Sequence, residues 1–343
     1  MDLTLGPEQE AVRDAIRGVL ADRLPLPRVR AVVAEAPGID VAAWREAGGL
    51  GWFGLGVPAA EGGAGYGLPE EMILFVELGR SLAPGPWLGT VLAAHVLGRA
   101  PALRGVHADV LAGVWRVAVV DDREDALGRA TRLAGTVRGV ADARAASGLL
   151  VLGSEAVRYV TADVAGLTAD VQPSMDPTRP LARLHFDVVE STMVGTDATR
   201  LRHVAAVLVA AEAVGIAERT LEMSVAYGKV RHQFGRPIGS FQAVKHRCAD
   251  MAVRAEVARS VTMLAAVALR DDDDDAAHHV RVAKALAADA AIINATDNIQ
   301  NHGGMGFTWE ADAHLYLKRA WILEHTFGTR AAHLDALAAP WRR

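Results

Sequence analysis

The spacing of apolar residues changes twice along this 343-residue chain, and these changes constrain its fold more than any other feature. Over the first hundred residues the apolar side chains recur at helical spacing, as in Val12, Ile16, Val19 and Leu20. Six short runs rich in Val and Leu follow, broken by Gly, Asp or Ser, and they continue to about residue 190. Such runs are typical of β-strands at hairpin spacing. The rest of the chain has helical spacing again, in Ala-rich segments at about 198–228, 240–270, 276–300 and 311–325.

This order of helices, strands and helices predicts an α+β chain with a β domain between two helical domains. We expect an N-terminal helical domain at 1–107, a central antiparallel β domain at 108–194 and a C-terminal four-helix bundle at 195–343. Gly6-Pro7, followed by acidic residues, predicts the start of the first helix, and Gly195-Thr196-Asp197 is expected to contain the N-cap of the first bundle helix. The alternation of strands and helices that marks a Rossmann fold does not occur in the sequence.

Composition and charge exclude several classes of protein. The formal net charge is −5, and a chain of this acidity is poorly suited to binding nucleic acid or an anionic membrane. The one cysteine, Cys248, rules out a disulfide within the chain and fits a reducing compartment. The sequence has no leader-like segment and no run of eighteen charge-free apolar residues. We therefore expect a soluble, cytoplasmic protein with no membrane or nucleic-acid partner.

Two further stretches resemble ligand sites but have simpler interpretations. The segment RDDDDDAAHH, at 270–279, could hold a metal ion, but adjacent acids that repel one another are more typical of a solvated loop. The cluster Gly62-Gly63-Ala64-Gly65 follows no predicted strand and lacks the lysine of a phosphate-binding loop, so we expect a packing turn. No metal site is predicted.

Two motifs are more informative, and the first is RHQFGRPIGSFQAVKHRCADM at 231–251. A long helix is expected to end at Arg231, and Ser240 to cap the next helix. The tight connection between them contains Phe234-Gly235. Arg231 and Gln233 would project from this corner with donors suited to a phosphate or a heterocycle. The pattern alone equally allows a purely structural corner between two helices.

The second motif is DNIQNHGGMGFTWEAD at 297–312, where polar residues close a helix that otherwise appears buried. Gly303-Gly304 follow as a C-cap, and two adjacent glycines allow another backbone or a flat ligand to approach closely. The polar residues are Asn298, Gln300, Asn301 and His302. A lone histidine such as His302 is more often structural than catalytic.

In this order and at this separation, the two motifs resemble the acyl-CoA dehydrogenase family. LGWFGLGVPAAEGGAGYGL, at 50–68, is similar to the family's N-terminal helical domain, and LYLKRAWILEHTFGTR, at 315–330, to its closing segment. The resemblance implies FAD as cofactor, an acyl-CoA substrate, and a dimer or tetramer with flavin near the subunit interfaces. It also implies an acceptor of the electron-transfer flavoprotein type. The cofactor-binding residues it implies are Arg231, Gln233, Phe234, Gln242, Gln300, Asn301, Gly303 and Gly304.

Family members remove the α-proton of the thioester with a carboxylate in a water-poor pocket. The usual position of this base corresponds to Phe327, and a second family position to about Ala205, so neither residue can accept a proton. Glu324 and Glu212 lie near these positions but off them, and we interpret both as ordinary helix residues. No catalytic residue is therefore predicted.

The β domain departs from the family as well. The stretches at 119–128 and 138–147 lack the tryptophan and hydroxyl residues that contact flavin and thioester in the same subunit. The motifs that reach the neighbouring subunit's FAD are kept. This division indicates a partner subunit, in an α2β2 complex with a base-carrying homologue that acts on a bulky, steroid-derived or similar acyl-CoA. Two alternatives stay open: a self-sufficient dehydrogenase that uses Glu324, and a non-redox scaffold or binding protein.

Overall fold

The computed structural model describes residues 3–35 and 37–339. The chain divides into two compact units. The first, here called the helical unit, comprises Met1–Leu26, Met72–Ala83 and Ala206–Arg343. The second, the sheet unit, comprises Pro27–Glu71 and Pro84–Ala205. The first and last helices thus share a unit, and the three domain bounds expected from the sequence stay a prediction.

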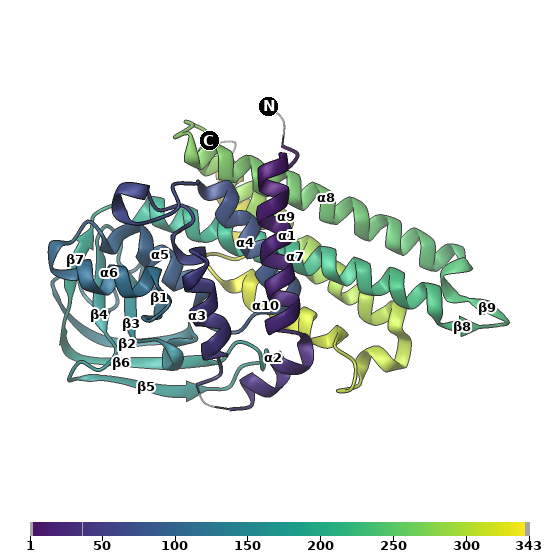
Figure 1. Cartoon of the computed structure of the whole chain (residues 1–343), viewed down its shortest axis with the longest axis horizontal. Helices are drawn as coiled ribbons and strands as arrows, with labels where there is room; N and C mark the ends of the chain where they lie inside the picture. Colours follow the sequence, from purple (N-terminus) through teal and green to yellow (C-terminus); the bar gives the residue numbers. More distant parts are fainter. Residues whose placement is uncertain (1–2, 36, 340–343) are drawn as a thin grey trace. The chain divides into compact units, whose positions relative to one another are not determined.

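In the helical unit, long Ala-rich helices pack around α9 (Figure 1). α9 packs against α8, α10 and α11, and buried alanines along it allow these close approaches. The prediction of four bundle helices is confirmed within two residues at each end. The bounds are α1 Pro7–Arg23, α4 Leu68–Ser81, α7 Ala198–Val230, α8 Gln242–Arg270, α9 Ala276–His302, α10 Ala313–His325 and α11 Arg330–Ala338.

Two glycines bring α4 and α7 into backbone contact. A Cβ atom on Gly79 would lie 2.0 Å from the carbonyl oxygen of Glu212, and one on Gly215 would lie 2.0 Å from that of Val76. Neither position leaves room for a side chain. Gly6 is the N-cap of α1, as expected, and the helix that follows it buries Ile16 and Leu20.

The sheet unit combines short helices with two β-sheets. Its helices are α2 Leu26–Val33, α3 Val41–Gly49, α5 Trp87–Leu97 and α6 Arg104–Leu111. Its strands are β1 Val117–Asp121, β2 Arg132–Ala141, β3 Gly148–Leu152, β4 Val157–Thr161, β5 Leu167–Gln172, β6 Leu181–Glu190 and β7 Thr192–Gly195. The six expected runs each form a strand; β7 was not predicted. The N-cap expected within Gly195-Thr196-Asp197 is Asp197, because its carboxylate accepts a hydrogen bond of 2.8 Å from the Arg200 N–H.

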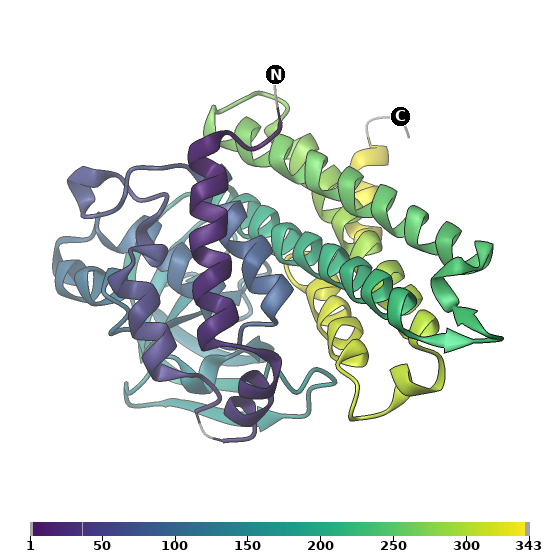
Figure 2. The ribbon, with the colours of Figure 1, turned by 45° about the vertical axis from the view of Figure 1, so that its right-hand side comes forward.

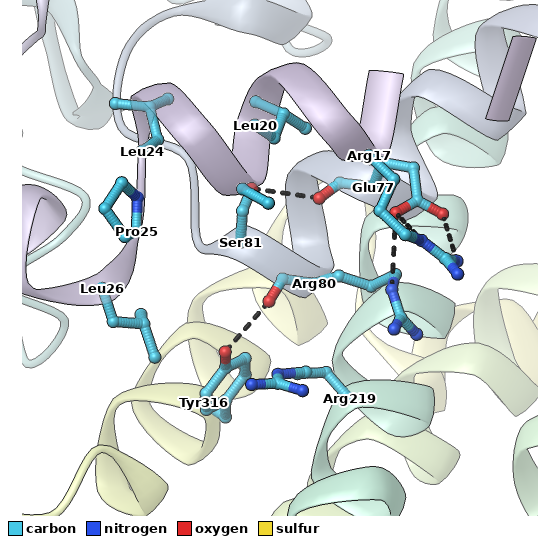
Figure 3. Close-up of a pocket in the computed structure, with 11 residues that line it drawn as sticks. Arg17, Leu20, Leu24, Pro25, Leu26, Glu77, Arg80, Ser81, Arg219 and Tyr316 are labelled. Carbon is cyan, nitrogen blue, oxygen red and sulfur yellow. Dashed lines mark hydrogen bonds and ion pairs between the residues drawn. The ribbon is translucent and has the colours of Figure 1, made fainter. Parts of the chain in front are cut away.

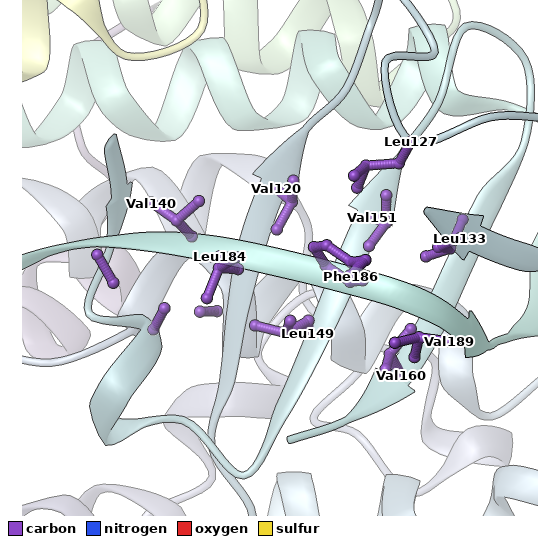
Figure 4. Close-up of a cluster of buried hydrophobic side chains, with 13 residues drawn as sticks. Val120, Leu127, Leu133, Val140, Leu149, Val151, Val160, Leu184, Phe186 and Val189 are labelled. Carbon is purple, nitrogen blue, oxygen red and sulfur yellow. The ribbon is translucent and has the colours of Figure 1, made fainter. Parts of the chain in front are cut away.

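One sheet has the strand order β1-β3-β4-β7 and the other β2-β6-β5. A single cluster of buried side chains draws on both sheets, among them Leu133, Val151 and Phe186 (Figure 4). The α+β class with a central β domain is confirmed, and all but one of the strand pairs in these two sheets are antiparallel. β1 and β3 are parallel, because β2 belongs to the other sheet and the chain returns alongside β1 in the same direction.

The glycine cluster at 62–65 is a packing turn, as predicted. A Cβ atom on Gly63 would lie 2.2 Å from the carbonyl oxygen of Val57, so a side chain cannot be accommodated there. The acidic residues 271–275 are exposed between α8 and α9. Over the described residues, no three His, Cys, Asp or Glu side chains are grouped so that they could hold a metal ion.

Candidate functional site

Both predicted motifs lie at the same end of the helical unit, where α7, the hairpin formed by β8 (His232–Gln233) and β9 (Arg236–Pro237), α8 and α9 meet (Figure 2). The ring of Tyr227 stacks on that of His302 with centroids 4.2 Å apart. The hydroxyl of Ser224 donates a 2.9 Å hydrogen bond to the Asn298 amide oxygen. These contacts fix the end of α7 against the end of α9, so residues about 75 positions apart share one site, which we call the bundle end.

The connection expected after Arg231 is a two-residue hairpin turn. Phe234 and Gly235 both have positive φ, 52° and 76°, as two-residue turns between antiparallel strands require. Glycine tolerates this conformation, whereas a phenylalanine in it is strained. The Phe234 side chain is also 90% exposed. A strained aromatic held in solvent contributes little to the stability of the isolated chain.

One detail of the predicted corner is wrong. Ser240 does not cap α8: its hydroxyl donates a 2.7 Å hydrogen bond to the Pro237 carbonyl, and Phe241 occupies the N-cap. A 3-10 turn, Ile238–Ser240, shifts the start of α8 by one residue and removes the serine from the capping position.

The bundle end carries hydrogen-bonding groups that the chain itself does not use. Within the described parts of the chain, the side chains of Arg231, Gln242 and Gln300 make no hydrogen bond or ion pair. Gln233 donates to its neighbour's carbonyl, that of His232, at 2.9 Å. Exposed donors of this kind suit a phosphate or a heterocycle.

Two glycines of the second motif, Gly303 and Gly304, face open space, whereas Gly306 is buried against Ile299. A Cβ atom on Gly303 or on Gly304 would have no neighbour within 4 Å, and Gly303 has a positive φ of 59°. Asn301 differs from them, since it is buried, and its amide oxygen accepts a 2.7 Å hydrogen bond from Arg247. His302 is held by the Asn298 carbonyl oxygen at 2.8 Å, which agrees with a structural histidine.

Large apolar side chains surround these groups in solvent. Phe307 is 80% exposed and Trp309 is 63% exposed. We call the set the bundle-end patch; its members are Val230, Phe234, Met305, Phe307 and Trp309. Trp309 also packs against His314 and Lys318 of this chain, but exposed apolar side chains of this size are typical of surfaces that contact another molecule.

The turn between α10 and α11 contains HTFGTR and the position of the family base. Phe327 is buried and has a φ of 56°, and Gly328 has a φ of 102°. Thr329 caps α11 through a 3.1 Å hydrogen bond from the Ala332 N–H. The turn is therefore well formed although it carries no carboxylate at position 327.

Lys284, on α9, hydrogen-bonds to the backbone at this turn. Its buried ammonium donates hydrogen bonds of 3.0, 3.1 and 3.0 Å to the carbonyl oxygens of Leu323, Glu324 and Gly328. Burial lowers the pKa of Lys284 to about 8, so the group is protonated at neutral pH. Sequence reasoning missed Lys284; a lone lysine among the alanines of α9 was the available signal.

Neither nearby glutamate is available as a base. Glu212 forms a buried ion pair of 2.6 Å with Arg319. Glu324 accepts a 2.9 Å hydrogen bond from the Arg330 N–H and thereby caps α11. Ala205, at the second family position, is a buried apolar residue of the sheet unit.

In the sheet unit, the loop at 119–128 satisfies its own polar groups. Asp122 accepts hydrogen bonds from the N–H groups of Ala126 and Leu127, at 2.8 and 3.2 Å. Asp125 accepts from the hydroxyl and N–H of Ser154, and the hydroxyl contributes most to lowering the pKa of Asp125 to about 2. Its acids thus stabilise the loop itself.

The fold belongs to the class of helical proteins with an inserted β domain, and comparisons with known proteins identify the family. Residues 6–101 match the acyl-CoA dehydrogenase N-terminal domain, and residues 196–340 match the C-terminal domain. The chain is 35% identical to acyl-CoA dehydrogenase IpdE2 of Mycobacterium tuberculosis, over 93% of the chain and 92% of IpdE2. The chain therefore belongs to the acyl-CoA dehydrogenase family, whose members are oxidoreductases acting on acyl-CoA.

A second relative is longer. The chain is 38% identical to acyl-CoA dehydrogenase FadE34 of Mycobacterium tuberculosis, over 93% of the chain but only 46% of FadE34. The chain thus spans about half the length of that protein.

Solved structures are similar over nearly the whole chain. The ChsE4-ChsE5 complex from Mycobacterium tuberculosis matches with a TM-score of 0.90 and 26% identity, covering 100% of this chain and 99% of that one. A variant of the Tcur3481-Tcur3483 steroid ACAD matches with a TM-score of 0.88 and 28% identity, covering 99% of each chain. None of the described helices has the length and apolar character needed to cross a membrane.

Proposed function

We propose that this chain is the partner subunit of a heteromeric acyl-CoA dehydrogenase. The observation that carries the proposal is a difference between two regions of the helical unit, the bundle end and the turn at Phe327. The bundle end leaves donors and apolar side chains unused by the chain itself, whereas the turn at Phe327 is well formed and lacks a base. A subunit that completes a homologue's site, and has no proton to remove itself, would have both properties.

The groups at the bundle end fit FAD. Arg231 supplies a guanidinium for the pyrophosphate, and Gln233, Gln242 and Gln300 supply amides for the adenosine side. Gly303-Gly304 leave room for a flat ring or a phosphate, since no side chain occupies the space beside them. When bound, FAD supplies the acceptor for the hydride that leaves the thioester. This chain's residues bind and orient it from outside the reacting centre.

The base is assigned to the homologous subunit. In this chain, Glu212 and Glu324 are both engaged in structural contacts, and the acids of the loop at 119–128 bond to their own backbone and to Ser154. The self-sufficient alternative requires Glu324 to leave the N-terminus of α11. No observation favours the scaffold alternative.

The relatives' names support the type of complex and substrate. The ChsE4-ChsE5 structure is a complex by its name, and the Tcur3481-Tcur3483 protein is named a steroid ACAD. We therefore assign an α2β2 assembly with a base-carrying homologue and a bulky, steroid-derived acyl-CoA as substrate. The electron acceptor would be of the electron-transfer flavoprotein type, and the location cytoplasmic.

Expression of the chain alone and with base-carrying homologues from the same genome tests the proposal. The cognate pair should purify as one complex with a flavin absorbance spectrum and oxidise acyl-CoA, while the chain alone should be flavin-poor. A flavin-loaded homo-oligomer with full turnover would contradict the proposal and support the self-sufficient alternative. A salt-sensitive shift of DNA would support a binding protein instead.

A further inference from the structure

A separate cavity of about 410 Å³ lies within the helical unit, between α1, α4, α7 and α10 (Figure 3). Its volume is in the range of small-molecule sites. None of the residues that line it belongs to the bundle end or to the turn at 326–329. Arg219 also lines a neighbouring pocket together with Tyr227, Val230 and His302 of the bundle end, so the cavity adjoins the proposed flavin site through this one side chain.

One side of the cavity is apolar. It is formed by the last turn of α1 and the residues that lead into α2, namely Leu20, Ala21, Leu24, Pro25 and Leu26. Leu20 and Leu24 are buried, while Ala21 and Pro25 are exposed at the entrance. This side suits a compact hydrocarbon body.

The opposite side is polar, and its lining holds more cationic than acidic side chains, while Glu218 and Glu222 outside the lining pair with Arg80 and Arg219. Three arginines, Arg17, Arg80 and Arg219, line the cavity with one carboxylate, Glu77. The hydroxyl of the buried Tyr316 donates a 2.9 Å hydrogen bond to the Arg80 carbonyl oxygen. The charges of the lining residues alone sum to +2, because three guanidinium groups face one carboxylate.

The three guanidinium groups differ in how well they are paired. Arg80 bonds to Glu222 at 2.7 Å and to Glu218 at 3.2 Å, and Arg17 binds Glu77 through two nitrogen atoms at 2.8 and 2.9 Å. Arg219 has one ion-pair contact of 3.3 Å, to Glu222, in which both side chains are at least 40% exposed, and its guanidinium also hydrogen-bonds to the Tyr316 hydroxyl. An exposed pair of this kind contributes little energy, so Arg219 can exchange it for another anion.

We propose that this cavity binds a small amphipathic monoanion, a carboxylate on a compact apolar body, with Arg219 as the main cation. The carboxylate would lie at Arg219 and the spare donor of Arg17, and the hydrocarbon would lie against Leu20 and Leu24. A guanidinium binds a carboxylate in a planar, two-bond geometry, which favours this head group over a neutral one.

A series of three ligands of equal shape tests the charge requirement. Calorimetric titration of the full chain would compare 1-adamantanecarboxylate, 1-adamantanemethanol and 1-adamantylammonium. We expect the carboxylate to bind about tenfold or more tightly than the alcohol, and the ammonium to bind least, because charged hydrogen bonds are stronger than neutral ones. Equal affinity of the three compounds, or no binding of the carboxylate, would overturn the proposal.

Three variants locate the site. Arg219→Gln should reduce the carboxylate's affinity to that of the alcohol, and Ala21→Trp should abolish binding of both by filling the entrance. Arg13→Gln is the matched control, since Arg13 lies one turn before Arg17 on α1 but outside the cavity. If Arg219→Gln and Arg13→Gln have the same effect, the binding site is not this cavity.

Discussion

Two regions of the helical unit, the turn between α10 and α11 and the bundle end, differ in how completely they satisfy their own polar groups. At the turn, Lys284 binds three carbonyl oxygens and Thr329 caps the next helix. At the bundle end, Arg231 makes no side-chain hydrogen bond or ion pair with the described residues, and Phe234 is strained and 90% exposed. The first region is complete in the isolated chain and the second is not.

This difference fits the proposal that the turn is structural and that the bundle end contributes to a site shared with a partner subunit. Buried polar groups must be paired for a chain to fold, so the turn survives without its base. Exposed donors and aromatic side chains contribute little to the stability of the chain, and the proposed function assigns them to contacts with FAD and the partner subunit. Substitutions in the two regions should therefore have different effects.

The largest effect is expected at the buried ion pair beneath the turn. Glu212→Met should lower the free energy of unfolding by about 3–5 kcal/mol, because Arg319 would stay buried without a counter-ion. Urea unfolding measures this loss. Glu256→Met, on the exposed face of α8, is the control and should change stability by less than about 0.5 kcal/mol. A stable Glu212→Met variant that inactivates the complex would instead identify Glu212 as a base.

Removal of the lysine that holds the turn should have the next largest effect. Lys284→Met leaves three carbonyl oxygens without their donor and should lower the free energy of unfolding by about 2–3 kcal/mol. Lys229→Met is the matched control, since Lys229 is exposed on α7 and should be nearly neutral. Equal unfolding midpoints for the two variants would show that the turn does not depend on Lys284.

A substitution at the bundle end should weaken association with the partner and leave the stability of the free chain unchanged. Phe234→Asn should weaken association with the partner by about 2 kcal/mol, because a large aromatic contact is lost. The free chain should keep its stability, because Asn accepts the positive φ of 52°. Val114→Asn, in the sheet unit, is the control. Sedimentation of the mixed subunits gives the affinity, and an unchanged affinity would exclude Phe234 from the interface.

The pH dependence of stability is a finer test of Lys284. Its pKa is about 8 in the folded chain, against an ordinary value of 10.5 for a solvated lysine, so the unfolded chain binds more protons between these values. Stability contributed by this group should therefore rise with pH from about 8 to 10.5, by at most about 1.4 kcal/mol per pH unit. The comparison of the wild type with Lys284→Met isolates this rise; identical pH profiles would contradict it.

The smallest effect is expected at Glu324. Glu324→Gln retains an acceptor for the Arg330 N–H, so it should change stability by less than about 0.5 kcal/mol and leave turnover of the complex within about twofold. Steady-state kinetics measures this. Loss of turnover would instead assign the proton transfer to Glu324.

Much of the fold could be predicted because its signals are local. Apolar spacing predicted α1 and the bundle helices, and runs of Val and Leu predicted six strands. The parallel pairing of β1 and β3 could not be predicted, because it depends on β2 joining another sheet. The prediction that Ser240 caps α8 is wrong because a 3-10 turn precedes this helix.

For the candidate site, the sequence predicted which motifs matter but not which side chains face solvent. Asn301 and Gln300 are adjacent on α9, yet Asn301 is buried against Arg247 while Gln300 is exposed. The ammonium of Lys284 meets carbonyls about 40 residues away, a contact that only the packing of α9 on α10 creates.

The flavin content of the purified complex tests the central claim most directly. Complexes would carry either the wild-type chain or Arg231→Met, each with the same unmodified, base-carrying partner, and their flavin absorbance per complex would be compared. We expect Arg231→Met to weaken flavin binding about tenfold or more while the complex still assembles. An Arg231→Met complex that keeps its full flavin content would contradict the assignment of a shared flavin site.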